Sequence, residues 1–427
     1  MLRLLLLSDI HFLSLYEEMD SHAAIRKAFL KDLSDYKNEY GVIDHILVCG
    51  DIASKGEKNE YDAAYRFFEE LCSIVDCKQE EIYIVPGNHD KNFNASNSEV
   101  RHLIHSGLSN EKINSDKLFI ELLDNNFAQF KALYQPFKDY QDFAVKMLSC
   151  EPLMTKCLDE GKDSVYDNKK DKAYMMVNLK SIENYPVLLY AMNTSLCSDW
   201  YDVNDFEKGH KLFLPKLSYN TNADREDCIN IAMMHHPTSR LVSGEQIAEV
   251  LDDHFQIQIF GHLHKPVSES NRAVHIHSGA LQPPKDENDN SLSYFSVYNI
   301  LEIQVKNENN IDNLHVQLRV EKYDDESKEF TEICEESKKI IFPLKKHVNR
   351  WQEKKYPQEQ EKLLPDGVTD RTVKYKFLQI QNPKYIMRRM NYYYNDNVSH
   401  NMNCINFLNK IQSERRMSEL WNVINQK

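Results

Sequence analysis

Five short motifs along this chain contain side chains that can bind metal ions. They read DIH, GD, GNHD, HHP and GHLH, and they begin at Asp9, Gly50, Gly87, His235 and Gly261. Their Asp, Asn and His side chains offer the oxygen and nitrogen donors that borderline divalent cations accept. Each motif alone is weak evidence for a metal site, because such short motifs also occur by chance. The two histidines of GHLH, for example, would more often be ordinary surface residues if they stood alone. The five together, in this order, predict a metal site.

The motifs follow apolar runs that are typical of buried strands. These runs span residues 2–7, 43–49, 82–85, 187–192, 229–234 and 257–260, and five of them end near a motif. In open α/β sheets, the ligand site lies outside the carboxyl ends of the strands. We therefore expect Asp9, Asp51, Asn88, His235 and His262 to converge on one pocket.

Helical patterns occupy much of the sequence between these runs. Residues 23–36 and 61–75 have apolar side chains at helical spacing, and Ser243 with Gln246 predicts a capping box that opens another helix. The long interval before His235 begins with helical sequence, so we expect residues 91–184 to form a helical insertion over the site.

The last third of the chain changes character twice. Four β-rich segments are expected to complete a second sheet, at residues 274–277, 294–300, 301–305 and 314–320. These segments predict a catalytic domain over residues 1–320. The strongly charged residues 321–340 predict a linker, and residues 341–427 predict a separate appendage, basic and rich in aromatic residues.

The composition is that of a globular protein, with 41% hydrophobic and 28% charged residues over 427 positions. The leucine run at residues 4–7 is too short for a signal peptide, and no stretch approaches the roughly 20 apolar residues that span a bilayer. The nine cysteines are odd in number and form no CxxC pair, which favours reduced thiols. We expect a cytoplasmic protein without a membrane partner.

Charge is distributed unevenly along the chain. Residues 331–427 contain 18 Lys and Arg against 11 Asp and Glu, a net of +7, which leaves −21 on the first 330 residues. Lys and Arg interleaved with tyrosines, as in the run Tyr392 to Tyr394, could bind nucleic acid by neutralising phosphates and stacking bases. We favour the alternative, in which the aromatic side chains pack on the core or on a protein partner.

With these motifs, the chain resembles the calcineurin-like metallophosphoesterase superfamily, whose pattern is D-x-H, GD, GNH(D/E), H and GHxH over roughly residues 1–300 here. The resemblance implies an α/β fold of four layers, an αββα sandwich with two mixed sheets, to which the helical insertion and C-terminal appendage are added. It also implies a binuclear centre. Asp9, His11 and His264 would hold one metal, Asn88, His235 and His262 the other, and Asp51 would bridge them.

Phosphoester hydrolysis suits such a centre. Two cations lower the pKa of a shared water, so a metal-bridging hydroxide can attack the phosphorus, and they neutralise the phosphoryl oxygens. We expect His89 to assist the leaving group and Asp90 to orient a neighbouring group. Manganese is the favoured ion, with iron or zinc as alternatives. His235 is preferred to His236 as the ligand, because the family's ligand usually lies two residues before the proline.

The sequence around the bridging Asp favours one branch of the superfamily. Its protein phosphatases carry an Asp three residues later and then an Arg, whereas this chain has Ser54 and Lys55 and a GNHD motif. A phosphoester substrate of the phosphodiester class is therefore expected. Two alternatives stay open, namely a DNA or RNA nuclease that uses the basic C-terminal region and a non-catalytic scaffold for a protein partner.

Overall fold

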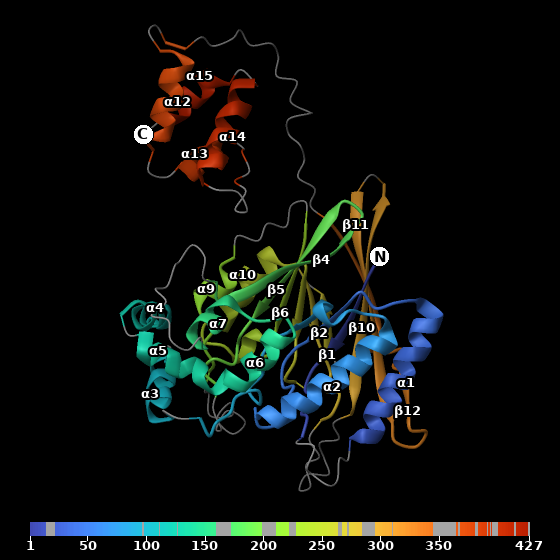
Figure 1. The fold of residues 1–427 in the computed structure, drawn as a ribbon. Coiled ribbons are helices and arrows are strands. Elements are labelled where there is room, and N and C mark those ends of the chain that lie inside the picture. Colours follow the sequence, from blue (N-terminus) through green and yellow to red (C-terminus); the bar gives the residue numbers. More distant parts are fainter. Residues whose placement is uncertain are drawn as a thin grey trace. The chain divides into compact units, whose positions relative to one another are not determined.

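Two compact units make up the chain, Met1–His347 and Val348–Lys427, and each is described by itself (Figure 1). The structure is a computed structural model. It describes residues 1–13, 22–95, 98–110, 112–125, 127–158, 172–198, 211–221, 228–263, 267–270, 273–283, 295–309, 311–344, 364–365, 368–380, 383–390, 392, 394, 400–413 and 416–425.

The first unit contains two mixed sheets. One has the strand order β12-β11-β10-β1-β2-β3, with β13 paired to β11, and the other has the order β4-β5-β6-β7-β9-β8. The first sheet consists of β1 (Leu2–Leu7), β2 (His45–Val48), β3 (Ile82–Ile84), β10 (Val297–Glu308), β11 (Ile311–Asp324), β12 (Glu329–Glu332) and β13 (Lys338–Pro343). The second consists of β4 (Tyr174–Ile182), β5 (Tyr185–Met192), β6 (Ile229–Met234), β7 (Ile257–Phe260), β8 (Val267–Ser270) and β9 (Val274–His277).

The strands that precede the motifs are parallel within each sheet. In the first sheet β1 pairs with β2 and β2 with β3, and in the second β5 pairs with β6 and β6 with β7, all in parallel. Their carboxyl ends therefore lie along one edge of each sheet, which is the arrangement that the sequence predicts.

The leucine run of β1 is buried on both faces. Leu5 and Leu7 pack in a core against helices, whereas Leu4 and Leu6 pack in the core between the two sheets. Successive side chains of a strand point to opposite faces, so a strand covered on both sides needs an unbroken apolar run. The run at the start of the chain is thus a central strand.

Helices cover the outer faces and complete four layers. A core cluster joins the first sheet to α1 (Ala23–Tyr40), α2 (Lys58–Val75), α3 (Ser98–Leu108), α4 (Ser115–Asn125), α5 (Phe127–Tyr134), α6 (Lys138–Lys146) and α7 (Pro152–Leu158). A separate cluster joins the second sheet to α9 (Lys216–Tyr219) and α10 (Gly244–His254). The arrangement confirms the predicted αββα sandwich, with added helices before β4 and after the sheets.

The structure differs from the sequence-based expectations at the end of the first unit. Residues 297–305 belong to one strand, β10, and residues 314–320 belong to β11. Both strands lie in the first sheet and not in the second. Residues 321–340, expected to be a linker, contain the end of β11, all of β12 and the start of β13. Their charged side chains lie on strands at the sheet margin, where one side faces solvent, so high charge there is compatible with a strand.

The expected helical insertion at residues 91–184 also contains a strand. Its described helices end with α7, and β4 then pairs antiparallel with β5 at the edge of the second sheet. Met176 on β4 is 40% exposed. An edge strand with one open face has a weaker apolar pattern than a central strand, and this explains why the sequence did not predict it.

Helix α10 begins where the sequence predicts, but without the expected capping box. Ser243 is the N-cap residue, yet its φ is 55° and its side chain makes no capping hydrogen bond. The left-handed backbone is accompanied by a tight approach at the next residue, where a Cβ on Gly244 would lie 2.0 Å from the Thr238 carbonyl oxygen. The loop is therefore specified by close packing of the backbone rather than by a side-chain cap.

The described part of the second unit contains four helices around a small apolar core. They are α12 (Asp370–Leu378), α13 (Pro383–Arg389), α14 (His400–Ser413) and α15 (Met417–Asn425). Phe407 is fully buried, with its ring 4.9 Å from Phe377 and 5.1 Å from Tyr392. No helix in the described part of the chain is long and apolar enough to cross a membrane.

Candidate metal centre

The first two motifs are held together by main-chain hydrogen bonds. The Asp9 N–H donates to the Gly50 carbonyl at 3.0 Å, and the His11 N–H donates to the Asp51 carbonyl at 3.0 Å. Asp9, His11 and Asp51 all have φ between 50° and 54°, and His262 has φ 67°. Residues other than glycine rarely adopt this left-handed backbone, and such strain is often found at functional sites. Here it coincides with four predicted ligands.

The glycines of three motifs allow this close packing. A Cβ on Gly87 would lie 2.1 Å from Asp51 Oδ1, and one on Gly50 would lie 2.6 Å from His235 Nδ1. A Cβ on Gly261 would lie 2.2 Å from Ser8 Oγ. Any larger residue would therefore push apart the backbone segments that present the candidate ligands.

Three predicted ligands meet around His235. Its Nε2 lies 3.2 Å from Asn88 Oδ1 and 3.3 Å from Asp51 Oδ2, and its Nδ1 lies 2.6 Å from the Cys49 carbonyl oxygen. A carbonyl oxygen only accepts hydrogen bonds, so Nδ1 carries the proton that it shares with Cys49. This contact fixes the ring so that Nε2 faces the two oxygens, just as metal-binding histidines are commonly oriented by donating their other ring N–H to a carbonyl oxygen.

Asp51 belongs to two groups of candidate donors. One consists of Asp9, Asp51 and His235, and the other of His11, Asp51 and His89, with the donor atoms of each group within 4.8 Å of one another. Asp51 Oδ1 also accepts the His89 N–H at 2.7 Å. The sequence did not predict that His89 would lie among possible ligands, and its ring is 4.7 Å from that of His11.

Electrostatics keep Asp51 ionised. Burial alone would raise its pKa, but His235, His89 and His11 outweigh burial and hold the pKa well below its usual value. Burial likewise lowers the pKa of His235, whereas Asp51 and Asp9 raise it, to about 9. The site therefore carries closely spaced opposite charges in a region shielded from water.

Asp90 has a structural task at this site. Its carboxylate accepts the N–H groups of Ile52, Ala53 and Gly87 at 3.0, 3.0 and 2.9 Å, and the Tyr61 hydroxyl at 3.1 Å. The described contacts tie the GNHD turn to the turn after β2. Asp90 was expected to orient a neighbouring group, and the groups that it contacts are backbone amides and the Tyr61 hydroxyl rather than a histidine ring.

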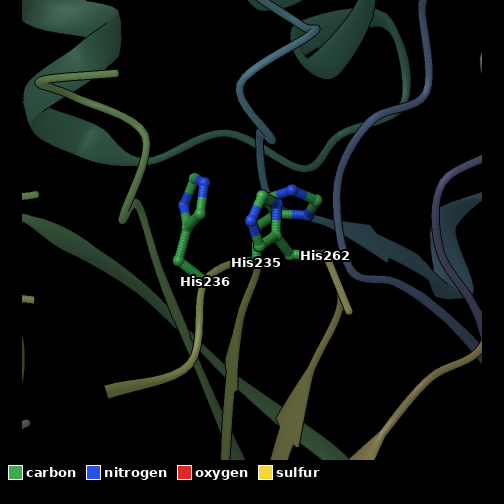
Figure 2. A group of neighbouring side chains, drawn as sticks. All are labelled: His235, His236 and His262. Carbon is green, nitrogen blue, oxygen red and sulfur yellow. The ribbon is translucent and has the colours of Figure 1, made fainter. Parts of the chain in front are cut away.

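The GHLH motif is described only in part. The His262 N–H donates to Asp9 Oδ2 at 3.2 Å, and its ring lies 5.3 Å from that of His235 and 4.6 Å from that of His236 (Figure 2). His264 lies outside the described residues, so its predicted role stays a prediction. The described Asp9, His11, Asp51, Asn88, His235 and His262 all lie at the carboxyl ends of their strands.

A sixth strand end contributes residues that the motifs did not reveal. After β5, Asn193, Thr194 and Ser195 are buried, and Thr194 Oγ1 lies 3.0 Å from His236 Nδ1. The apolar run 187–192 was recognised as a strand without a motif. Its parallel pairing with β6 is the signal that places the following residues beside the HHP motif.

The donor set fits divalent cations. His235 Nε2 lies 3.2 Å from Asn88 Oδ1 and 3.3 Å from Asp51 Oδ2, close to the separation expected for ligands that share an ion at about 2.1 Å. A mixture of imidazole nitrogens with carboxylate and amide oxygens suits manganese, iron or zinc. The geometry therefore provides two candidate ligand groups that share Asp51, and a third that consists of His235, His236 and His262.

The family model for calcineurin-like phosphoesterases matches residues 2–266. This chain belongs to that family. The match covers the five motifs and strands β1 to β7, and members of the family generally bind two divalent metals. None of the curated protein sequences matches this phosphoesterase-family chain.

Solved structures similar to this calcineurin-like chain include two Vps29 proteins and SoxB. Vps29 from Entamoeba histolytica, as a single-residue variant, is 11% identical with a TM-score of 0.31, and covers 81% of this chain and 100% of its own. Vps29 from Chaetomium thermophilum is 9% identical, with a TM-score of 0.33 and the same coverage. The sulfate thiohydrolase SoxB from Thermus thermophilus is 8% identical, with a TM-score of 0.32, and covers 78% of this chain and 58% of its own.

Proposed function

We propose that the protein is a phosphoester hydrolase with two metal ions, and that it acts on phosphodiesters. The observation that carries this proposal is that Asp51 belongs to two groups of candidate donors. A carboxylate can bridge two cations, because each of its oxygens can contact one of them. Divalent cations held there would lower the pKa of a shared water and neutralise charge on the phosphoryl oxygens.

The residues of the chain have separable tasks in this reaction. His235 presents Nε2 because the Cys49 carbonyl holds its Nδ1. Asn88 supplies a neutral oxygen, which adds no charge that would repel a phosphate. Asp90 keeps the GNHD turn in place through backbone contacts. Together these contacts hold the donors before a substrate arrives, which favours catalysis by preorganisation.

We assign the proton transfer in this proposal to His89. Its Nδ1 lies 2.8 Å from the Ser54 carbonyl oxygen, so Nδ1 carries a proton and Nε2 is left for exchange with the substrate. Its backbone N–H is fixed by Asp51. In its doubly protonated form, with one proton held by the Ser54 carbonyl, the imidazole can donate its Nε2 proton to a departing alkoxide.

The diester assignment rests on the sequence after Asp51. Ser54 and Lys55 occupy the positions where the protein phosphatases of the superfamily have Asp and Arg. Purified full-length protein with manganese should therefore hydrolyse a chromogenic diester faster than the corresponding monoester. A preference for the monoester would reject the diester assignment.

Two variants test the roles within the site. His89→Ala should keep both metal ions and lose turnover by about 100-fold or more, as expected for a general acid. Asp51→Asn should lower metal content, measured by inductively coupled plasma mass spectrometry. His102→Ala, at an exposed position of α3, is the matched control and should behave like the wild type. Normal activity in both site variants would reject the proposed roles.

A further inference from the structure

The two adjacent histidines of the HHP motif have different hydrogen-bond partners. His235 and His236 are both fully buried, and their rings lie 4.6 Å apart (Figure 2). His235 Nδ1 faces the Cys49 carbonyl oxygen, whereas His236 Nδ1 faces the Thr194 hydroxyl. A carbonyl can only accept a hydrogen bond, but a hydroxyl can also donate one. The tautomer of His236 therefore depends on how Thr194 uses its proton.

The contacts of Thr194 assign that proton. Thr194 Oγ1 accepts the His236 backbone N–H at 2.9 Å, and it lies 3.0 Å from His236 Nδ1. Within the described residues, its hydroxyl has no other acceptor. Ser195 Oγ lies 3.5 Å from the same nitrogen, but it donates to the Pro86 carbonyl at 3.0 Å. These contacts leave Thr194 free to donate to Nδ1, and with that assignment the proton of a neutral His236 ring is on Nε2.

This proton has no acceptor among the described residues, although His236 is fully buried. A buried N–H without a partner costs free energy comparable to a lost hydrogen bond. A second such donor lies on the neighbouring strand end. Asn193 Oδ1 accepts the Ser195 N–H at 2.9 Å, whereas Asn193 Nδ2 has no acceptor in the described part of the chain. Two unused donors at adjacent strand ends indicate a missing acceptor.

We propose that His236 binds a phosphoryl oxygen of the substrate through Nε2–H and does not ligate metal. This inference rests on the proposed function, since the acceptor is the phosphate of the substrate. The His236 ring lies 4.6 Å from that of His262, and one ring nitrogen of His236 lies within 4.8 Å of ring nitrogens of His235 and His262. Donors aimed at phosphoryl oxygens stabilise the charge that they carry. The HHP motif would thus supply a metal ligand and a substrate donor from successive residues.

The first test compares metal and phosphate binding in the full chain loaded with manganese. His236→Leu removes the Nε2–H donor and places an apolar side chain at this buried position. It should keep the wild-type metal content and bind inorganic phosphate roughly 10- to 100-fold more weakly in calorimetry, as expected for one hydrogen bond to a charged group. The KM for a small diester should rise with less change in kcat. His236→Gln, whose amide N–H can replace Nε2–H, should recover most of the affinity.

Two results of this test would overturn the inference. A lower metal content in His236→Leu, with phosphate binding lost in proportion, would make His236 a ligand. An unchanged phosphate affinity would mean that water or packing satisfies Nε2–H. His102→Leu, at an exposed position, is the matched control and should change neither quantity.

The second test reads the tautomer directly and requires no turnover. In the full chain with ¹⁵N-labelled histidine, long-range NMR spectra should show His236 protonated at Nε2, with that signal shifting when inorganic phosphate is added. The His236→Gln variant assigns the signal. A proton on Nδ1, or no shift with phosphate, would overturn the inference. A wild type that holds no metal and hydrolyses no phosphoester would reject the proposed function separately, and the NMR result would still decide the role of His236.

Discussion

The two units differ in what they bury. Every buried Asp, Glu, Lys, Arg or His side chain among the described residues lies in the first unit, and Asp9, Asp51 and Asp90 at the candidate site are examples. In the described part of the second unit, the core is apolar and Asn403 is the buried polar residue. Burying charge costs free energy unless it is paired. The first unit buries charged side chains at its strand ends despite this cost, whereas the described part of the second unit has an apolar core.

The largest expected effect tests the close packing of the first unit. Gly87→Ala would place a Cβ 2.1 Å from Asp51 Oδ1, so the carboxylate or the GNHD turn must move. Misplacing a catalytic group by about 1 Å can cost about 100-fold in rate, and we expect a loss of that order in diester turnover. The turnover number from steady-state kinetics and the metal content should both fall.

The matched control for this prediction is Gly107→Ala. There a Cβ would meet the end of the Leu118 side chain at 2.9 Å, and a side-chain terminus can move. This variant should retain nearly full activity, and circular dichroism should show both variants folded. Full activity in Gly87→Ala would contradict the proposed role of close backbone approach.

An intermediate effect concerns the second unit. Phe407 is fully buried, and replacing it with Ala should destabilise this unit by about 3–5 kcal/mol. Hydrogen exchange over residues 370–425 should become faster, while turnover of a small diester stays within about twofold of the wild type because the chemistry belongs to the other unit. Tyr375→Ala, at a position that is 65% exposed, is the control and should leave exchange unchanged.

The same variant distinguishes the hypotheses for the basic region. Phe407 and Tyr392 serve as core residues, which favours a packing role for aromatic side chains over base stacking. Phe407→Ala should therefore change the cleavage rates of single-stranded DNA and of a small diester only slightly, and by a similar factor. Selective loss of DNA cleavage would favour the nuclease hypothesis. Loss of both activities would show that the chemistry of the first unit depends on the second.

The smallest expected effect involves a buried acid outside the candidate site. Glu151 precedes α7, and burial raises its pKa to about 8 from 4.5. The folded protein therefore keeps this proton where the unfolded chain has released it, so stability falls as the pH rises from about 4.5 towards 8. Glu151→Gln should melt roughly 2 °C or more above the wild type at pH 9, with a smaller gap at pH 4.5.

Scanning calorimetry at the two pH values checks this prediction. Diester turnover at a fixed pH should stay near the wild-type value, since Glu151 makes no described contact with the candidate ligands. Equal melting temperatures for both proteins at pH 9 would show that Glu151 is ionised in the folded state.

The sequence predicted the parts of the fold that follow from local patterns. The ranges 2–7, 229–234 and 257–260 match β1, β6 and β7, because strands buried on both faces need continuous apolar runs. Strands β4, β12 and β13 were not predicted, since edge strands carry exposed and charged residues. Their places depend on pairing partners that are distant along the chain.

The candidate site was predictable to a similar degree. The motif residues were found because their types suit metal binding, and strand order brings the described ones together. The contacts that set their roles were not visible. The tautomer of His236 depends on Thr194, which is 42 residues away, and the role of Asp90 depends on the amides of Ile52 and Ala53. Such contacts follow from the fold, and no local pattern specifies them.

Anomalous diffraction at the manganese edge, from crystals soaked in manganese, tests the central claim most directly. The account predicts two peaks on either side of the Asp51 carboxylate, about 3.5–4 Å apart as in other two-metal sites. Crystals of Asp51→Asn should show weaker peaks at these positions. A single peak away from Asp51 in the wild type, or none at all, would contradict the account.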